Sequence, residues 1–438
     1  MSASNKPRKT GINNQWNDGL MDQIVSRENM TEAYKRVLRN KGSGGIDEME
    51  VEDLKPYLEE HWSSIKIALL ENGYYPEKVL QVEIPKETGG IRLLGIPTVL
   101  DRLIQQAIHQ ILEPIYDPNF SNNSFGFRPK RSARQAVKIA KSYISSGKRW
   151  IVNVDLSKFF DEVDHDRLLS KLRIKIKDRR VIHLIERYLR VGIMSHGIEE
   201  SRRKGTPQGS PLSPILSNIV LDELDKELEG RGHLFVRYAD DFQIYVGSKQ
   251  SAERVMFNLE HFIEKTLKLK VNKKKSTIER PWVSNFLGYS FTVNKQTKLK
   301  VSKESLRRIK GKIKELYRKG KGMNLGRFIT EKLNPVIRGW MIYFSASDVK
   351  GFTKDLDKWI RHHLRKIIWR QLKRNWTRLK ALLKRGLNEE RAVQSVFNQR
   401  GPWWNSGASH MNMAYPNSYF EKIGLLSLRQ IHTKFYQN

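Results

Sequence analysis

FVRYADDFQIYV, residues Phe235–Val246, sets two adjacent carboxylates between apolar runs that are typical of buried strands. A buried carboxylate is costly unless it is paired or bound to a metal ion. At a tight strand-to-strand turn, one carboxylate can project into a cleft while its neighbour supports it. Taken alone, Asp240 and Asp241 could also belong to an ordinary polar turn, because Asp is common in turns. Their interpretation therefore depends on acidic residues elsewhere in the chain.

A second apolar strand, WIVNVDL (Trp150–Leu156), also carries an acidic residue, Asp155. Hard oxygen ligands from two neighbouring strands suit Mg²⁺, which keeps several waters and is completed by substrate phosphates. Two such ions about 3.5–4 Å apart can activate a hydroxyl nucleophile and stabilise a leaving group. The pattern predicts a catalytic site at Asp155, Asp240 and Asp241 with two Mg²⁺ ions, for which Mn²⁺ could substitute.

The composition indicates a polyanionic partner. The 438 residues carry 80 Lys and Arg against 47 Asp and Glu, a formal net charge of +33. Nucleic acid is the first candidate and an anionic membrane the second. We expect no membrane association, because no apolar run approaches the roughly 20 residues that cross a bilayer and the N-terminus lacks the apolar core of a secretory signal. The absence of cysteine excludes disulfides and Cys-ligated metals and fits a cytoplasmic protein.

The coarse pattern mixes helices and strands. Residues 21–72 have helical spacing on both sides of a Gly-rich loop, Asn40–Met49. Short strands are expected at 81–86 and 91–97 around a Gly-Gly turn, followed by a helix over 99–116. Such alternation predicts an α+β core in which helices cover one face of a sheet.

Residues 295–385 are strongly basic, with 28 Lys and Arg against 6 Asp and Glu. A helix is predicted over Asp357–Leu379, with an apolar stripe that includes Trp376 and with cations over most of the remaining surface. Such an excess of one sign favours phosphate contacts over a merely solvated helix, which remains the alternative. The predicted RNA- or DNA-binding residues are Arg361, Arg365, Lys366, Arg370, Lys373 and Arg374.

Eight stretches resemble, in order, the conserved blocks of the reverse transcriptases encoded by group II introns. Together they run over about residues 21–370, and eight blocks in sequence are far more specific than any one of them. The stretches are NKGSGGIDEM (Asn40–Met49), IPKETGGIRLLGIPTVLDRLIQQAI (Ile84–Ile108), SFGFRPKRSARQAV (Ser124–Val137), WIVNVDLSKFFDEVDHDRL (Trp150–Leu168), KGTPQGSPLSPILSNIVLDELD (Lys204–Asp225), YADD (Tyr238–Asp241), LKVNKKKS (Leu269–Ser276) and FLGYSF (Phe286–Phe291).

The resemblance implies an α+β right-hand polymerase, with fingers, a palm built on an antiparallel sheet, a helical thumb and a small C-terminal module. The implied parts are a flexible basic arm over 1–20, an N-terminal extension of the fingers over 21–80, fingers and palm over 81–295, a thumb and maturase domain over 296–370, and a candidate DNA-binding module over 371–438. No Cys/His cluster follows this module, so the endonuclease domain of some relatives is expected to be absent, as in group IIC-like members.

The same resemblance assigns metal-binding roles. Asp155 and Asp240 would bind the metal ions directly, Asp241 would support them, and Leu156 would offer its backbone carbonyl.

The residues expected to contact the incoming deoxynucleotide come from three blocks. Lys86 and Arg92 would grip the triphosphate, Phe160 would crowd a ribose 2′-hydroxyl as a steric gate, and Gln208 would brace the nucleotide or template base. The alternatives are an exposed charged hairpin for the two cations, a core position for Phe160 and an idle side chain in a Pro-Gly turn for Gln208.

Template and primer would contact loops of the fingers and palm. Backbone amides of the Gly-rich loop would approach phosphates, the FGFRP loop would stack on and hold the templating region, and the lysines of LKVNKKKS would face phosphates. The alternatives are, in the same order, a plain linker, a structural loop and a solvated lysine run. The expected residues are Asn40, Lys41, Gly42, Gly44, Gly45, Phe127, Arg128, Lys273 and Lys275.

The favoured function is an RNA-directed DNA polymerase that adds dNTPs to a primer 3′ end and also binds its intron RNA to assist splicing and retrohoming. The expected partners are group II intron RNA, an RNA template, a DNA primer, a DNA target and dNTPs, whereas the oligomeric state is not predicted. The alternatives are a splicing factor without polymerase activity, an RNA-templated RNA polymerase and a domesticated enzyme of DNA repair. The intact carboxylates argue against the first, and Phe160 argues against the second because a small residue would be needed to admit ribose.

Overall fold

The computed structural model describes residues 19–85, 89–195, 198–200, 204–207, 209–294 and 296–436. The chain forms two compact units, one of residues 1–136 with 150–278 and the other of residues 137–149 with 279–438. Two of the predicted site residues, Lys86 and Gln208, lie outside the described residues. Among the residues that are described, no helix is long and apolar enough to cross a membrane.

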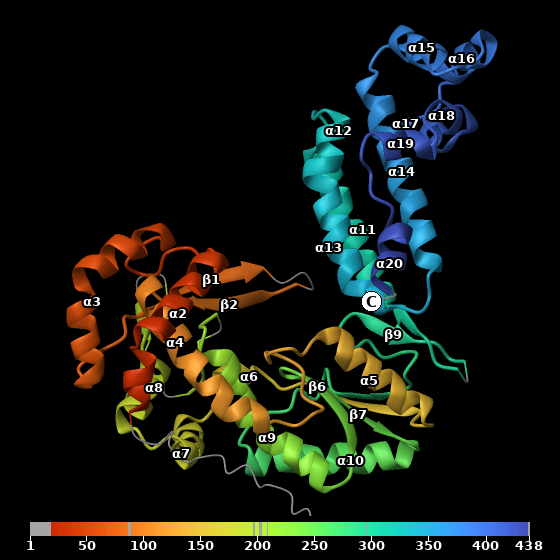
Figure 1. The fold of residues 1–438 in the computed structure, drawn as a ribbon. Coiled ribbons are helices and arrows are strands. Elements are labelled where there is room, and N and C mark those ends of the chain that lie inside the picture. The colour runs from red at the N-terminus through yellow and green to blue at the C-terminus, as the bar shows by residue number, and fades with distance from the viewer. Residues whose placement is uncertain are drawn as a thin grey trace, which may run out of the picture. The chain divides into compact units, whose positions relative to one another are not determined.

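The first unit begins with helices and a fingers-type hairpin (Figure 1). The predicted hairpin strands form, and the predicted helix over 99–116 forms with those bounds because Thr98 caps it by accepting a hydrogen bond from the Asp101 amide. Leu20, which the sequence assigns to the N-terminal arm, instead begins the first helix and is fully buried. The elements are α1 (Leu20–Ile24), α2 (Arg27–Asn40), α3 (Leu54–Leu70), β1 (Val79–Pro85), β2 (Ile91–Ile96) and α4 (Val99–Tyr116).

A four-stranded sheet forms the core of the same unit, in the order β6-β7-β3-β8. Its β6/β7 and β7/β3 pairs are antiparallel, and α9 and α10 pack on these strands. β4 and β5 belong instead to the sheet of the hairpin, in the order β2-β1-β4-β5. The elements of the unit that follow α4 are β3 (Trp150–Val154), α6 (Phe159–Glu162), α7 (His165–Lys175), α8 (Arg179–Arg190), β4 (Ile193–Ser195), β5 (Ile198–Glu200), α9 (Ser213–Gly230), β6 (Leu234–Tyr238), β7 (Asp241–Val246), α10 (Lys249–His261) and β8 (Thr277–Glu279). The prediction of an α+β core is confirmed.

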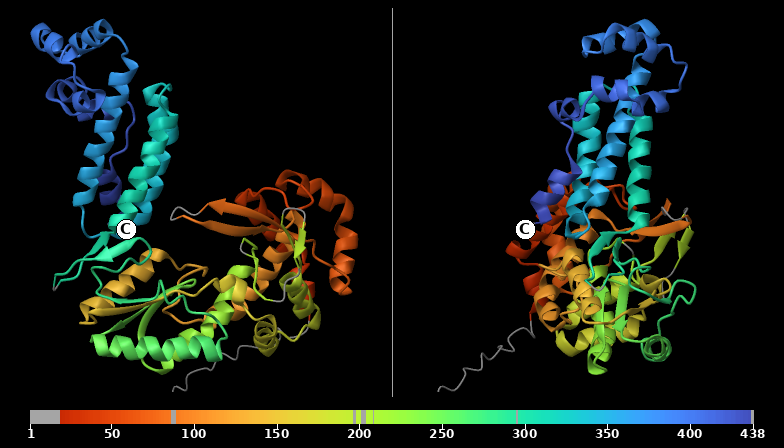
Figure 2. Two further views of the ribbon diagram at one scale, coloured as in Figure 1. Left: turned by 180° about the vertical axis from the view of Figure 1, so that it is seen from behind. Right: turned by 90° about the vertical axis from the view of Figure 1, so that its right-hand side faces the viewer.

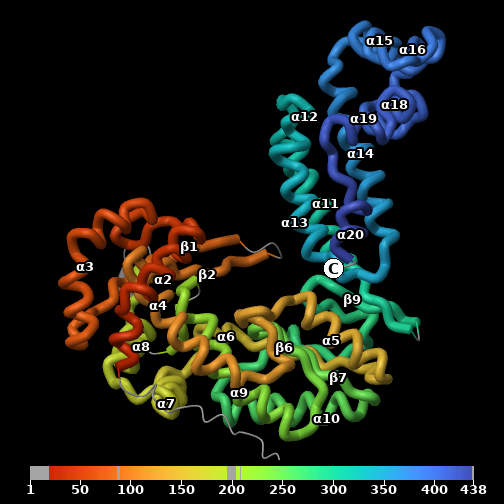
Figure 3. Tube along the Cα trace, in the orientation of Figure 1, coloured from red at the N-terminus to blue at the C-terminus, as the bar shows by residue number. Residues whose placement is uncertain are grey.

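The second unit is mainly helical. Figures 2 and 3 show α11, α13 and α14 running alongside one another, and ring contacts of Tyr317 with Trp359 and of Trp340 with Phe352 join them. The elements are α5 (Ala133–Ser145), β9 (Tyr289–Phe291), β10 (Leu299–Val301), α11 (Lys303–Lys319), α12 (Leu325–Arg327), α13 (Asn334–Tyr343), α14 (Gly351–Gln371), α15 (Asn375–Lys384), α16 (Glu389–Val396), α17 (Pro402–Gly407), α18 (Ser409–Ala414), α19 (Asn417–Lys422) and α20 (Leu428–Tyr436).

The predicted helix Asp357–Leu379 is wrong in its second half. α14 ends at Gln371, and a new helix, α15, starts at Asn375. The break lets Leu379 and Leu382 turn into a separate small core with α16, while Trp376, which was placed on the apolar stripe, is 69% exposed. Tertiary packing therefore overrides a periodicity that continued through the break.

Candidate active site

The two central carboxylates lie at a hairpin turn between β6 and β7. Tyr238 pairs with Asp241, which leaves Ala239 and Asp240 as the two turn residues. Ala239 has φ 58°, the left-handed conformation that two-residue hairpin turns need to match the twist of their strands. The turn thus projects Asp240 beyond the sheet, and its side chain is exposed.

The third carboxylate comes from the neighbouring strand. The β3/β7 register ends at the pair Val154 and Phe242, so the next residue, Asp155, comes opposite Asp241. Opposed residues of antiparallel strands have Cα atoms about 4.5–5.5 Å apart. The fold therefore brings Asp155, Asp240 and Asp241 together, as the sequence predicts.

Hydrogen bonds to a second segment fix Asp155. Its amide donates to Ser276 Oγ at 3.1 Å, and its carbonyl accepts from the Asn272 amide at 2.8 Å. Lys275 Nζ lies 3.9 Å from Asp155 Oδ2, and Lys273 is exposed in the same turn. The predicted lysines of LKVNKKKS thus belong to the turn that borders the carboxylates.

Electrostatics at the site favour a bound cation. Burial, with repulsion from Asp155, raises the pKa of Asp240, and burial with repulsion from Asp240 and Asp155 raises the pKa of Asp241 to about 7. Both side chains reach solvent, and a divalent cation would relieve the repulsion among the carboxylates.

The donor set fits Mg²⁺. Among the described residues, no group of three or more His, Cys, Asp or Glu side chains forms a ready-made metal cage. Mg²⁺ is usually held by one or two carboxylates together with substrate phosphates and waters, which Asp155 and Asp240 could supply in part. The backbone hydrogen bonds on either side of Leu156 involve the Asp155 carbonyl and the Ser157 amide. Neither of them involves the Leu156 carbonyl, which was predicted to bind a metal ion.

Two predicted nucleotide-binding residues lie near this site. Arg92, on β2, is exposed, and its charge partly offsets the rise in the pKa of Asp240, so the guanidinium lies within electrostatic reach of the carboxylate. Phe160 lies on α6, half-buried, with its ring 5.2 Å from that of the buried Phe159. The Phe160 carbonyl accepts a hydrogen bond from the Thr206 amide at 2.6 Å, so the TPQGS block lies directly against this helix.

The same block also contacts the fingers hairpin. Gly209 has φ +112°, and a Cβ there would lie 2.6 Å from the Gly95 carbonyl oxygen of β2. Gly209 is therefore needed both for its backbone conformation and for this close approach. Phe160, Gly209 and Arg92 consequently come from three distant segments that meet around one site.

A groove of about 410 Å³ gathers part of the predicted template contacts. Asn40, Gly42 and Phe127 line it, and the Phe127 ring is 50% exposed. Lys41 is exposed next to it. Gly44 does not line the groove, and neither does Gly45, where a Cβ would lie 2.6 Å from Thr98 Cα. These two glycines serve the packing of the loop.

One face of α4 also lines that groove and was missed from the sequence. Arg102, Gln106 and His109 line it, at the spacing of a single helix face. Arg102 Nη2 donates to the Ser43 carbonyl at 2.6 Å and so holds the Gly-rich loop. The polar spacing in LDRLIQQAIHQ was the signal that could have found this face.

Comparison with known proteins assigns the family. The reverse transcriptase (RNA-dependent DNA polymerase) family matches residues 84–291, and the group II intron, maturase-specific domain matches residues 306–386. Protein YkfC of Escherichia coli (strain K12) is 31% identical over 313 residues, which cover 62% of this chain and 82% of YkfC. The chain belongs to the group II intron reverse transcriptases.

A second relative, LtrA, agrees with this membership. Group II intron-encoded protein LtrA of Lactococcus lactis subsp. cremoris is 32% identical over 336 residues, which cover 62% of this chain and 56% of LtrA. The reverse transcriptase thus spans little more than half the length of LtrA. A telomerase structure from Candida albicans aligns over 80% of this chain and 64% of its own, at 14% identity and a TM-score of 0.45. The predicted right-hand polymerase fold and enzyme class, RNA-directed DNA polymerase, are confirmed by the family match.

Arg128 of the reverse transcriptase has an internal role. Its Nε donates to Asp117 Oδ1 at 2.6 Å, and its Nη atoms donate to the carbonyls of Asp117, Ser121 and Ser124. Because these bonds use its donors inside the protein, the structural role that was left open as the alternative is favoured over contact with the template.

The predicted basic residues of the second unit fall into two groups. Lys366, Arg370 and Lys373 line a groove of about 930 Å³ between α11 and α14, opposite Lys314, Arg318 and Lys321. Burial and the neighbouring cations Arg370, Lys321 and Lys314 lower the pKa of Lys366, as expected where like charges converge.

The remaining predicted cations lie elsewhere. Arg365 is 6% exposed and donates through Nε to the Tyr415 carbonyl at 3.0 Å, so its assignment to a nucleic-acid surface is corrected. Its position on the helix turns it inward, where it packs over the Phe420 ring. Arg361 and Arg374 do not line the groove.

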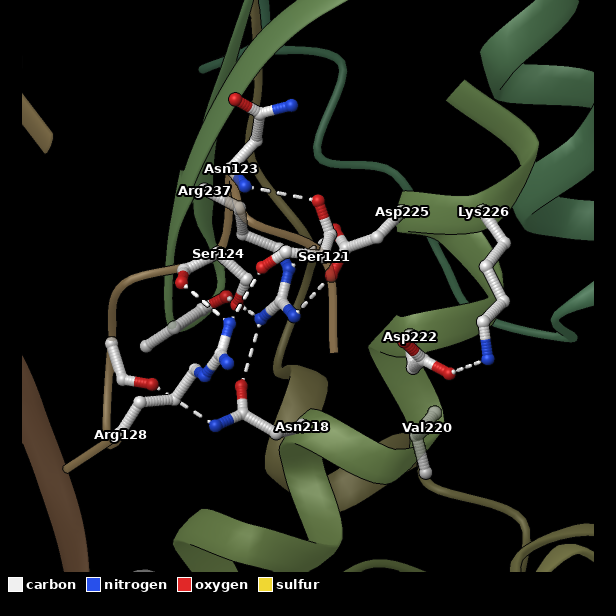
Figure 4. A network of polar contacts seen from close by, with 12 residues as sticks. Ser121, Asn123, Ser124, Arg128, Asn218, Val220, Asp222, Asp225, Lys226 and Arg237 are labelled. Carbon is white, nitrogen blue, oxygen red and sulfur yellow. Dashed lines mark hydrogen bonds and ion pairs between the residues drawn. The ribbon is translucent and has the colours of Figure 1, made fainter. Parts of the chain in front are cut away.

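A buried ion pair beneath the YADD turn was also missed. Arg237 and Asp225 are both fully buried, and two hydrogen bonds join them (Figure 4). The sequence signal was a charged residue inside the apolar strand FVRY, since a buried charge is retained only with a partner.

Proposed function

We propose that this reverse transcriptase adds deoxynucleotides to a primer 3′ end on an RNA template, with two divalent cations at Asp155 and Asp240. The observation that carries the proposal is the β3/β7 register, which sets Asp155 opposite the YADD turn. When bound, the cations would activate the primer hydroxyl and neutralise the phosphates. Asp155 and Asp240 would hold them, and Asp241 would add negative charge behind them.

The chain's own residues would orient the nucleotide. Arg92, within electrostatic reach of Asp240, would bind the triphosphate oxygens. Phe160, on the helix bonded to the TPQGS block, would exclude a ribose 2′-hydroxyl by contact. The groove of Asn40, Gly42 and Phe127 would guide the unpaired template toward the carboxylates.

Primer extension tests the polymerase proposal. With RNA template, DNA primer, dNTPs and Mg²⁺, Asp240→Ala should lose activity by at least about a thousand-fold, while RNA binding stays near wild type. Asp166→Asn, which changes an exposed carboxylate that is 87% accessible on α7, is the matched control and should remain active. Robust extension by Asp240→Ala would refute the metal assignment.

We further propose that the second unit binds intron RNA to assist splicing and retrohoming. The support is the match of residues 306–386 to the maturase-specific domain, together with the six-cation groove. Self-splicing of a candidate intron RNA at low Mg²⁺, with and without protein, tests it. Asp240→Ala should still promote splicing, whereas loss of splicing with that variant would mean that the two activities share the polymerase site.

A further inference from the structure

The guanidinium of Arg237 makes four hydrogen bonds to buried acceptors, with donor–acceptor distances of 3.0 Å or less. Nε donates to Asp225 Oδ1 at 2.7 Å and Nη2 donates to Asp225 Oδ2 at 2.5 Å, a two-point ion pair with both side chains 0% exposed. Nη1 donates to Asn218 Oδ1 at 2.9 Å. Asp225 and Asn218 both come from α9, so β6 is joined to the helix beneath it (Figure 4).

The remaining bond reaches the catalytic turn itself. Arg237 Nη1 donates to the Ala239 carbonyl oxygen at 3.0 Å. That carbonyl belongs to the peptide bond that leads into Asp240. Because Ala239 is in the left-handed conformation, which is unfavourable for a residue with a Cβ, an outside bond is well placed to hold it there.

A second segment confines the turn from the other side. Asn218 Nδ2 donates to the Gly126 carbonyl at 3.0 Å. A Cβ on Gly126 would lie 2.2 Å from the Ala239 amide nitrogen, so only glycine permits this approach. The backbone of Arg237 also bonds to this loop, through Asn123 and Phe125. The peptide before Asp240 is therefore held between the guanidinium and Gly126.

Stability alone is a weak explanation for this arrangement. A buried ion pair often contributes little net stability, because desolvation offsets the attraction, and apolar replacements can be neutral. An arginine instead fixes the relative positions of its acceptors, because the donors of the guanidinium lie in one plane. Groups behind a metal ligand commonly change metal affinity by about 10–100-fold when they are altered.

We propose that Arg237 is a positioning residue that sets the orientation of the Asp240 carboxylate toward the catalytic cations by holding the Ala239 carbonyl. Asp225 and Asn218 orient the guanidinium, and Gly126 closes the turn from the opposite side. The inference rests on the proposed metal-binding role of Asp240. It adds a requirement beyond the carboxylates themselves, which is that the peptide bond between Ala239 and Asp240 is held rigid.

The variant Arg237→Lys tests this proposal. Lys keeps the charge for Asp225, but its single ammonium cannot also bond to Asn218 and Ala239 in the same fork geometry. Mn²⁺ binding is measured by electron paramagnetic resonance on the complex with RNA template, dideoxy-terminated primer and a dNTP, which cannot react. We expect about ten-fold weaker Mn²⁺ binding and a matching increase in the Mg²⁺ concentration that half-saturates primer extension.

Two controls separate positioning from loss of stability. Leu228→Ala empties a buried site on α9 without touching the turn, and Arg167→Lys makes the same replacement in a half-buried pair, where Arg167 Nη2 lies 2.6 Å from Glu223 Oε1. Both should keep Mn²⁺ affinity within about two-fold of wild type, whatever their melting temperatures.

The outcomes are distinct. A lower melting temperature for Arg237→Lys with unchanged Mn²⁺ affinity would overturn the positioning role. If Asp240→Ala bound Mn²⁺ as well as wild type, the proposed metal site would fail instead. Should Arg237→Lys not fold, Asn218→Ala, which removes one acceptor of Nη1 and the bond to Gly126, should weaken Mn²⁺ binding several-fold. Unchanged binding by Asn218→Ala would equally overturn the proposal.

Discussion

Asp240 and Asp241 repel each other and Asp155 at the end of two paired strands. Burial, and then repulsion from the neighbouring carboxylates, raise the pKa of both residues, and both effects disfavour the charged side chains of the folded state when no cation is bound. Side chains arranged for a ligand commonly lower stability in this way.

Asp241→Asn should therefore increase stability while it reduces activity. Removing one repelling charge at a solvent-accessible position is expected to raise Tm in EDTA by about 1–3 °C. Calorimetry in EDTA and primer extension in Mg²⁺ measure the two effects. A clear fall in Tm would show that Asp241 makes a stabilising contact that outweighs the repulsion.

Phe160 offers a test of sugar selection. Phe160→Ala should admit ribonucleotides and reduce the preference for deoxynucleotides by at least about ten-fold, because the ring is the group expected to contact a 2′-hydroxyl. Single-nucleotide incorporation of dNTP against rNTP measures the preference. Phe160→Tyr keeps the bulk and should keep the discrimination, and an Ala variant with unchanged preference would place the ring in the core only.

Among the elements, the second unit is held together by polar anchors at the ends of helices. Asp348 accepts hydrogen bonds from Lys141 Nζ of α5 at 2.8 Å, from the Leu299 amide of β10 at 2.6 Å and from the Tyr436 hydroxyl of α20 at 3.0 Å. One carboxylate therefore ties three elements that lie far apart in sequence. Asp357 similarly accepts from Ser427 and from the Leu428 amide at the start of α20.

Asp348→Asn should loosen α20 and destabilise the second unit by about 1.5–3 kcal/mol, the range for hydrogen bonds to charged groups. Burial alone would raise the pKa of Asp348, but the bonds from Lys141, Leu299 and Tyr436 outweigh it and lower the pKa. A carboxylate with a lowered folded pKa adds stability above its unfolded pKa, about 4, and loses it as pH falls further.

Urea unfolding of the wild type and of Asp348→Asn measures this contribution. The gap between them should be full at pH 7 and should narrow below about pH 4. Asp355→Asn, which changes an exposed carboxylate on α14, is the matched control and should leave stability within about 0.5 kcal/mol of wild type. A gap that is unchanged at low pH would contradict the charge-based account.

Across the whole protein, positive charge is both excessive and uneven. The net charge is +33, and six cations of α11, α14 and the segment that follows each helix line one groove of the second unit. Clustered cations release counterions when a phosphate chain binds, which makes affinity depend steeply on salt. The groove thus gathers in one place part of the positive charge that the composition indicates.

Replacing Lys314, Lys366 and Arg370 with Gln should weaken RNA binding and flatten its salt dependence. We expect the slope of log K against log salt to fall by about 2–3, near one unit for each lost phosphate contact. Filter binding at several salt concentrations measures the slope. The control replaces Lys354, Lys358 and Lys380, which are exposed and lie outside the groove, and an equal effect there would argue for non-specific attraction.

The sequence by itself determined the elements and the chemistry that depend on neighbours in the chain. The bounds of α4, the hairpin strands of the fingers and the apolar strands around Asp155 and YADD follow from local periodicity and turn residues. The helix break after Gln371 and the inward positions of Arg128, Arg237 and Arg365 were decided only by the tertiary structure. The sequence alone does not show whether a cation faces solvent or a buried acceptor. Its partner, such as Asp225 or the Tyr415 carbonyl, is brought to it by tertiary packing.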